Sequence, residues 1–187
     1  MAPERQIGLS LIECIASMAI PCLLAGYGIP GVTHFLRNAD SVAAANRIVR
    51  AVNLTRHAAI TYGSTATLCP FMDGVDCGGT WAGALVTFVD SNMDGRLGGR
   101  EHVVAVIRPL SSGGTVRWRS FRNRQYLQFT GDGFTNYQNG NFVYCDATRN
   151  RWYARQIVLN VQGWARVMSR RDDAGYRVDR KGKPLRC

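Results

Sequence analysis

Residues 8–30, GLSLIECIASMAIPCLLAGYGIP, form an apolar run with one carboxylate, Glu13, close to its start. The stretch from Leu9 to Ile29 has about the 20 residues that one membrane-spanning helix needs. A carboxylate in hydrocarbon costs roughly 2.5–3.5 kcal/mol on insertion scales, so it marks a site that has a partner. We therefore predict a membrane-spanning helix over residues 9–30 whose Glu13 meets a positive charge. The alternative is a Glu13 that stays solvated among the lipid headgroups.

A secretory signal peptide is another interpretation of this run, with a small-residue cleavage site at Ala25-Gly26. The helical pattern, however, continues to about Tyr62 without a sign of a new N-terminus, so we expect the run to be retained. Over residues 31–63 apolar residues recur at steps of three and four, which predicts an amphipathic continuation of the same helix that ends at Gly63. The expected buried face comprises Phe35, Val42, Ala45, Ile48, Val49, Val52, Ala59 and Ile60, and the expected polar face Arg37, Asp40, Arg47, Arg50 and Arg56.

After Gly63 the pattern changes to short apolar runs separated by Asp/Asn/Gly clusters, which are typical of strands and turns. The predicted fold is α+β, with one long N-terminal helix packed on an antiparallel β-sheet domain over residues 64–171. A basic and irregular tail follows over residues 172–187. The predicted strands are 65–69, 84–90, 102–108, 115–119, 126–130, 141–145, 156–161 and 164–169.

The net positive charge is confined to the second part of the chain. Residues 1–114 contain 8 Arg and 8 acidic residues, whereas residues 115–187 contain 15 Lys and Arg and 5 acidic residues. The whole net charge of +10 therefore lies in the second part, and Arg supplies 21 of the 23 basic residues. This predicts an anionic partner, which is a nucleic acid or an acidic membrane or protein surface.

Two basic stretches contain aromatic residues. Arg117 and Arg119 fall on one face of a predicted strand, with Trp118 on the other. The second stretch repeats the pattern with Arg149, Arg151, Trp152, Tyr153 and Arg155. Arginines beside exposed aromatic rings suit phosphate contacts with base stacking. The alternative interpretation places Trp118 and Trp152 in the core.

Four of the six cysteines lie outside the apolar run, at Cys69, Cys77, Cys145 and Cys187. An even number behind a membrane segment indicates disulfides and an oxidising compartment such as a periplasm. Four cysteines allow three pairings, and unpaired thiols are a further alternative. The short loop between Cys69 and Cys77 favours local pairing, which leaves Cys145 for Cys187.

No catalytic set is found, because the histidines are scattered and no Ser/His/Asp set, metal-ligand pair or phosphate-binding loop is present. We expect no enzymatic activity and no cofactor. Asp90, Asn92, Asp94 and Glu101 do match the spacing of an EF-hand calcium loop. The residues before Asp90 are typical of a strand rather than a helix, which favours a β-hairpin turn over a calcium site.

The N-terminus resembles the class III signal of type IV pilins and pseudopilins, with a polar leader over residues 1–8, Gly8, an apolar run, Glu13 and Pro30. The resemblance implies that a prepilin peptidase cuts between Gly8 and Leu9 and methylates the new amine. It also implies a single-pass anchor in the inner membrane, a periplasmic C-terminal domain and other pilins as partners. A neighbouring subunit shifted by about a helical turn would place its Leu9 amine beside Glu13.

Downstream segments look like the GspH/FimT family of minor pseudopilins, and they are ANRIVRAVNLTRHAAITYG (45–63), TLCP (67–70), DGVDC (73–77), WAGALVTFVDSNMDG (81–95), FVYCD (142–146) and ARQIVLNVQGWARV (154–167). In the FimT branch, which is linked to natural transformation, a Gly-Arg-x-Arg turn contacts DNA. Gly163 and Arg166 match that turn, Trp164 replaces its first arginine, and Arg170 and Arg171 follow closely. The resemblance implies a minor pilin with non-sequence-specific DNA binding. The alternative is a structural priming or tip subunit, of a type II secretion pseudopilus or of a pilus, whose basic face meets acidic partner pilins.

Overall fold

The structure is a computed structural model that describes residues 10–72, 76–122 and 124–187. The predicted cleavage point between Gly8 and Leu9 lies outside the described residues. The chain divides into two compact units, Met1–Asn38 and Ala39–Cys187. The helix α1 (Leu11–Tyr62) begins in the first unit and ends in the second. Among the described residues, no helical stretch combines the length and the apolarity needed to count as a membrane span.

Both ends of α1 carry local capping signals. At its start, the Ser10 amide donates to Glu13 Oε2 at 2.9 Å and the Glu13 amide donates to Ser10 Oγ at 3.3 Å, which is a capping box. At its end, Gly63 has a φ of +56°, and the amides of Gly63 and Ser64 donate to the carbonyls of Ile60 and Ala59. This is a Schellman motif, so the predicted stop at Gly63 is confirmed.

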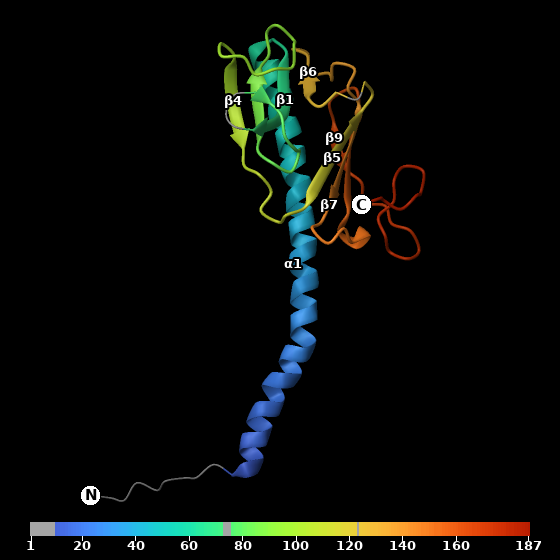
Figure 1. The fold of residues 1–187 in the computed structure, drawn as a ribbon. Coiled ribbons are helices and arrows are strands. Elements are labelled where there is room, and N and C mark those ends of the chain that lie inside the picture. Colours follow the sequence, from blue (N-terminus) through green and yellow to red (C-terminus); the bar gives the residue numbers. More distant parts are fainter. Residues whose placement is uncertain (1–9, 73–75, 123) are drawn as a thin grey trace, which may run out of the picture. The chain divides into compact units, whose positions relative to one another are not determined.

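The second unit contains two antiparallel sheets beside the C-terminal part of α1 (Figure 1). The first sheet contains β1 (Ala66–Met72), β2 (Asp76–Cys77), β3 (Leu85–Val89), β4 (His102–Ile107) and β6 (Leu127–Phe129). The second has the order β5-β7-β8-β9 and contains β5 (Thr115–Ser120), β7 (Gly140–Cys145), β8 (Arg155–Leu159) and β9 (Ala165–Val167). A 3₁₀ helix η1 (Arg151–Tyr153) precedes β8. The α+β prediction and all eight predicted strands are confirmed, whereas β2 escaped prediction because two residues show no periodicity.

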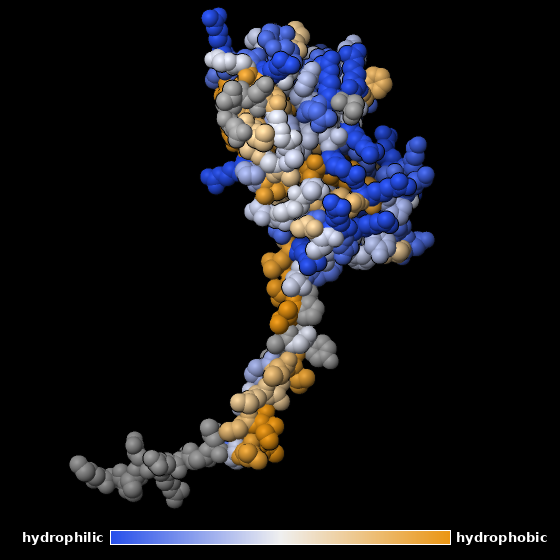
Figure 2. All heavy atoms as spheres, in the orientation of Figure 1, coloured by the Kyte–Doolittle hydropathy of each residue, from blue (hydrophilic) through white to orange (hydrophobic). Residues whose placement is uncertain are grey.

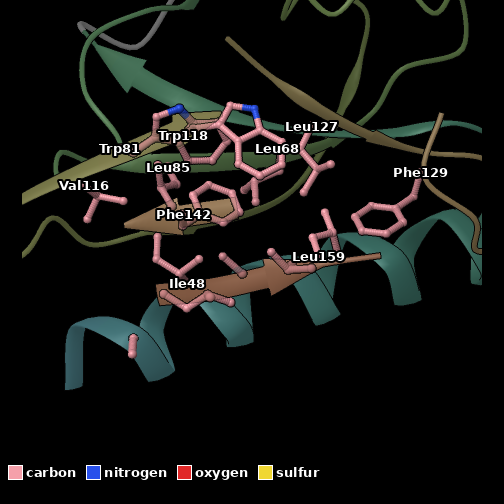
Figure 3. Close-up of a cluster of buried hydrophobic side chains, with 14 of the residues drawn as sticks. Ile48, Leu68, Trp81, Leu85, Val116, Trp118, Leu127, Phe129, Phe142 and Leu159 are labelled. Carbon is pink, nitrogen blue, oxygen red and sulfur yellow. The ribbon is translucent and has the colours of Figure 1, made fainter. Parts of the chain in front are cut away.

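A single core joins α1 to both sheets. Figure 3 shows Ile48 on the helix facing Leu159, Phe142 and the Trp81–Trp118 pair. The Trp118 and Phe142 rings stack with their centroids 4.2 Å apart. The helix contributes mainly small residues, which let its backbone approach the sheets closely. Its buried residues are Ser41, Ala44, Ala45, Ile48, Ala51, Val52, Thr55, Ala58 and Ala59.

The predicted helix faces were partly wrong. Val42 and Ile60 are 42% and 48% exposed, because small residues at seven-residue steps occupy the line that faces the sheets. Arg47 does not lie on a solvated face. It donates from Nε to the Arg108 carbonyl at 2.7 Å, from Nη1 to the Trp81 carbonyl at 3.0 Å, and from Nη2 to the Gly83 carbonyl. The burial of Arg47 lowers the pKa of its guanidinium.

Two disulfides are present, and they have the favoured pairing. Cys69 in β1 is bonded to Cys77 in β2, and Cys145 at the end of β7 is bonded to the terminal Cys187. The second bond joins residues 42 apart in sequence and ties the C-terminal tail to the second sheet. Cys14 and Cys22 in α1 are free and exposed.

Candidate functional site

One face of the second sheet carries exposed arginines on its two outer strands, β5 and β9, and we call these arginines the arginine row. The strand register pairs Arg119 with Asn141, Asn141 with Val158, and Val158 with Arg166. Arg119 and Arg166 therefore lie three strand spacings apart, which is about 14 Å. Arg117 lies two residues before Arg119 and shares its face, and all three arginines are exposed. The opposite face of the same strands carries Trp118 and Phe142 and faces the core.

The C-terminal tail lies across this arginine-bearing face. Val178 and Leu185 are buried, and isolated bridges join Arg171 to Arg177 and Val178 to Pro184. The predicted irregular tail is thus attached to the domain, although it contains no regular strand or helix. The physical reason is that two apolar residues and a disulfide fix a segment that is otherwise polar.

Between the tail and the sheet lie three adjoining hollows that share lining residues. We call them together the basic groove, and its cationic lining residues are Arg117, Arg119, Arg166, Arg180, Lys181, Lys183 and Arg186. Asp179 is the one carboxylate among the described lining residues, and its Oδ1 accepts the amides of Lys181 and Lys183. Figure 2 shows hydrophilic residues gathered on the side where β5, β9 and the tail lie in Figure 1.

The turn before β9 places an aromatic ring at one end of the groove. Gly163 has a φ of +81°, and a Cβ there would lie 2.6 Å from the Gly133 carbonyl oxygen, so glycine is required. Trp164, which lines the groove, is 57% exposed. The guanidinium of Arg56 lies 4.8 Å from the centre of the Trp164 ring, and Arg56 Nε donates to the Gly133 carbonyl at 2.9 Å. A cation from α1 therefore lies at the turn where tryptophan replaces the expected arginine.

Three other predicted residues, Arg151, Arg170 and Arg171, are exposed but are not among the described residues that line the groove. Arg171 lies 5.5 Å from the centre of the Trp152 ring, and its Nη1 donates to the Gly175 carbonyl at 2.6 Å. The structure thus brings Arg117, Arg119 and Arg166 together and leaves these three outside.

For the aromatic residues of the two basic stretches, the alternative interpretation that places them in the core is confirmed for Trp118 and only in part for Trp152. Trp118 and Tyr153 are 6% and 5% exposed, and Trp152 is half-buried against Tyr176. Arg155 is also buried. Its burial, with the positive charges of Arg177 and Arg171, lowers the pKa of its guanidinium to about 10. Strand alternation correctly places Trp118 opposite Arg117 and Arg119, but it does not tell which face of the sheet packs on the core.

Sequence reasoning also missed Arg56, Arg180 and Arg186. Their positions depend on the packing of α1 and of the tail, and no local motif marks them. The excess of charge in residues 115–187 was the one signal that pointed toward the tail.

The loop between β3 and β4 connects an antiparallel pair, as the hairpin interpretation predicted. Asn92 is hydrogen-bonded to Asp94, because its Nδ2 donates to Asp94 Oδ2 at 2.9 Å and its Oδ1 accepts the Asp94 amide at 3.2 Å. Asp90, Asp94 and Glu101 do come together, with one oxygen of each within 4.8 Å of the others.

A protein family and solved structures of a minor pilin and a minor pseudopilin are similar to this chain. The profile of a family described as "Type II transport protein GspH" matches residues 44–163, which is more than half of the chain. The type IV minor pilin FimU of Pseudomonas aeruginosa is similar in fold, with a TM-score of 0.56, 15% identity, and 71% of this chain and 91% of that chain covered. The minor pseudopilin EpsH from the type 2 secretion system of Vibrio cholerae has a TM-score of 0.49 and 11% identity, with 68% of this chain and 95% of that chain covered. No curated protein sequence matches this one.

The long helix packed on antiparallel sheets, the fold shared with FimU and the family profile agree with one another. The chain therefore belongs to the GspH family of minor pilins and pseudopilins, which are structural subunits and not enzymes.

Proposed function

We propose that this subunit binds the phosphate backbone of DNA in its basic groove, as part of a pilus that takes up DNA. The observation that carries the proposal is the arginine row on the second sheet, faced by the cations of the tail. Phosphates spaced along a backbone match cations spaced along a groove, and guanidinium groups hold phosphate oxygens with two parallel hydrogen bonds.

Such binding would not depend on base sequence. Phosphate contacts position a protein on nucleic acid but carry no sequence information. The exposed Trp164 ring, with Arg56 on it, offers one stacking surface at the end of the groove. A single exposed ring can stack on one terminal or unpaired base, as found at the end of a duplex or in a single strand.

For assembly, we propose that a prepilin peptidase cuts between Gly8 and Leu9 and methylates the new amine. Residues 9–30 would then anchor the subunit in the inner membrane, with the second unit in the periplasm. Glu13 would accept the Leu9 amine of a neighbouring subunit. The capping box with Ser10 supports this, because it fixes the Glu13 side chain at the first turn of α1, where a subunit shifted by about 6 Å along the axis would bring its amine.

The DNA proposal is tested by gel shift on random duplex DNA with the purified chain. The variant Arg119→Gln/Arg166→Gln removes two cations of the row, and Arg96→Gln/Arg100→Gln removes two exposed arginines of the β3–β4 loop as a matched control. Each lost phosphate contact lowers the slope of log affinity against log salt by about 0.9. The slope of the first variant should therefore be smaller than that of the unmodified chain by about 1.8. When salt rises from 50 to 200 mM, this variant should lose about twelvefold less affinity than the unmodified chain loses.

The control variant should keep the slope of the unmodified chain. No binding to random duplex at low salt, or equal slopes for the two variants, would refute DNA binding in the groove.

A second function fits the same basic groove, which could instead meet acidic surfaces of partner subunits in a pilus or in a type II secretion pseudopilus. Charge reversal at Arg119 and Arg166 in cells separates the two functions. Loss of DNA uptake with normal fibres supports the first function, whereas loss of assembled fibres supports the structural one.

A further inference from the structure

The loop from Asp90 to Glu101 holds a buried carboxylate with one unused oxygen. Asp90, directly after β3, is fully buried. Its Oδ2 accepts the Thr67 hydroxyl at 2.6 Å, the Gly95 amide at 3.0 Å and the Gln128 side-chain amide at 2.8 Å. Its Oδ1 is buried and has no hydrogen-bond partner among the described residues. The side chain is thus held firmly by one oxygen while the other is left without a donor.

Glu101, directly before β4, has the same arrangement. Its Oε2 accepts the Gly98 amide at 2.8 Å, and its Oε1 is buried without a partner among the described residues. Burial raises the pKa of Glu101, and the nearby negative charges of Asp90 and Asp94 raise it further. The three carboxylates therefore repel one another in the absence of a positive charge.

Two buried carboxylate oxygens without donors are costly, and a cation between them would remove that cost. We propose that Asp90, Asp94 and Glu101 bind a calcium ion at the base of the β3–β4 loop. One oxygen of each lies within 4.8 Å of the others. Calcium–oxygen distances of 2.3–2.6 Å place two oxygens of one ion at most about 4.6–5.2 Å apart, so three oxygens this close can share one calcium ion.

The spacing of the loop agrees with this assignment, although strands flank it in place of helices. Asp90, Asp94 and Glu101 are the first, fifth and twelfth residues of a loop with the pattern D-x-N-x-D-G-x5-E. Gly95, the sixth, has a φ of +73° and donates its amide to Asp90, which turns the chain back on the acidic side chains.

The ion would connect three strands of the first sheet. Asp90 is hydrogen-bonded to Thr67 in β1 and to Gln128 in β6, while Glu101 directly precedes β4. Calcium binding should therefore stabilise the folded second unit, in addition to ordering the loop.

The test is calorimetric titration of calcium chloride into the purified full-length chain after chelator treatment, with thermal unfolding in parallel. We expect one ion per chain with a dissociation constant of about 10⁻⁴ M, as for extracellular calcium modules, and a higher unfolding midpoint in calcium. The variants Glu101→Gln and Asp94→Asn should bind at least tenfold more weakly and lose most of that rise. Asp90 is left unchanged in both, because its other oxygen accepts three donors that support the fold.

Asp173→Asn removes an exposed carboxylate of the tail and is the matched control, which should behave as the unmodified chain does. Magnesium at equal concentration should raise the midpoint less than calcium. Absence of both heat and midpoint change with calcium at millimolar concentration would overturn the proposal, as would equal binding by Glu101→Gln, Asp94→Asn and the unmodified chain.

Discussion

Replacement of Arg47 by methionine should destabilise the folded domain by about 3 kcal/mol. Arg47 extends from α1 and donates to the carbonyls of Trp81 and Gly83, which precede β3, and to that of Arg108, which follows β4. Methionine retains most of the apolar stem but removes all three donors. The three carbonyl oxygens then lose the hydrogen bonds that Arg47 donates, and they either bind water or have no donor.

The magnitude follows from the exposure of these bonds. Hydrogen bonds to a charged donor contribute about 1.5–3 kcal/mol each when buried. Two of the Arg47 bonds are only partly buried and one is exposed, so water can replace part of what is lost. The lowered pKa of Arg47 also shows that its charge is partly desolvated, which reduces the net gain. About 1 kcal/mol per bond remains.

The assay is urea unfolding followed by the fluorescence of the buried Trp81 and Trp118, with thermal unfolding as a second measurement. The unfolding midpoint should fall by roughly 6–12 °C, at about 2–4 °C per kcal/mol for a domain of this size. Arg50→Met, one turn further along the exposed side of the helix, is the control and should change stability by less than about 0.5 kcal/mol. If Arg47→Met costs less than about 1 kcal/mol, or no more than Arg50→Met, the three hydrogen bonds of Arg47 contribute nothing beyond ordinary surface contacts.

The other predictions concern the turn and the disulfides of the second unit. Gly163→Ala should destabilise the domain by more than about 1 kcal/mol and weaken DNA binding, because its φ of +81° is strained for alanine and a Cβ would meet a carbonyl; unchanged unfolding would contradict this. Replacing Cys145 and Cys187 by serine opens a closure of 42 residues and should cost about 4 kcal/mol in urea unfolding. The same change at Cys69 and Cys77, which are 8 apart, should cost about 2.5 kcal/mol, and only the first pair should weaken DNA binding. A larger cost for the shorter closure would contradict the expectation that a disulfide closing a longer loop removes more entropy from the unfolded chain.

The basic groove depends on an attachment that is far from it in sequence. The bond between Cys145 and Cys187 holds the tail, and the tail carries more than half of the groove's cationic residues. A reducing environment would therefore disturb the groove before it disturbed the core, which is consistent with the predicted oxidising compartment.

Local features of the sequence were sufficient to predict the end of α1 and all the strands except β2. Gly63 stops the helix because the Schellman motif needs a residue with positive φ. The strands follow from short apolar runs bounded by turn residues, and the short spacing of Cys69 and Cys77 favoured their pairing. Each of these depends on interactions between residues that are close in the chain, so a pattern of a few residues contains the necessary information.

The tertiary structure alone decided which charged and aromatic side chains are available to a partner. Arg119 and Arg166 belong to one row because two intervening strands pair in one register, and Arg155 is buried although Arg151, in the same basic stretch, is exposed. Arg47 and Arg56, expected on a solvated face, bind carbonyls 34 to 77 residues away. The physical reason is that a helix or a strand determines only the direction of a side chain, whereas its environment is determined by elements that pack against it from distant parts of the chain.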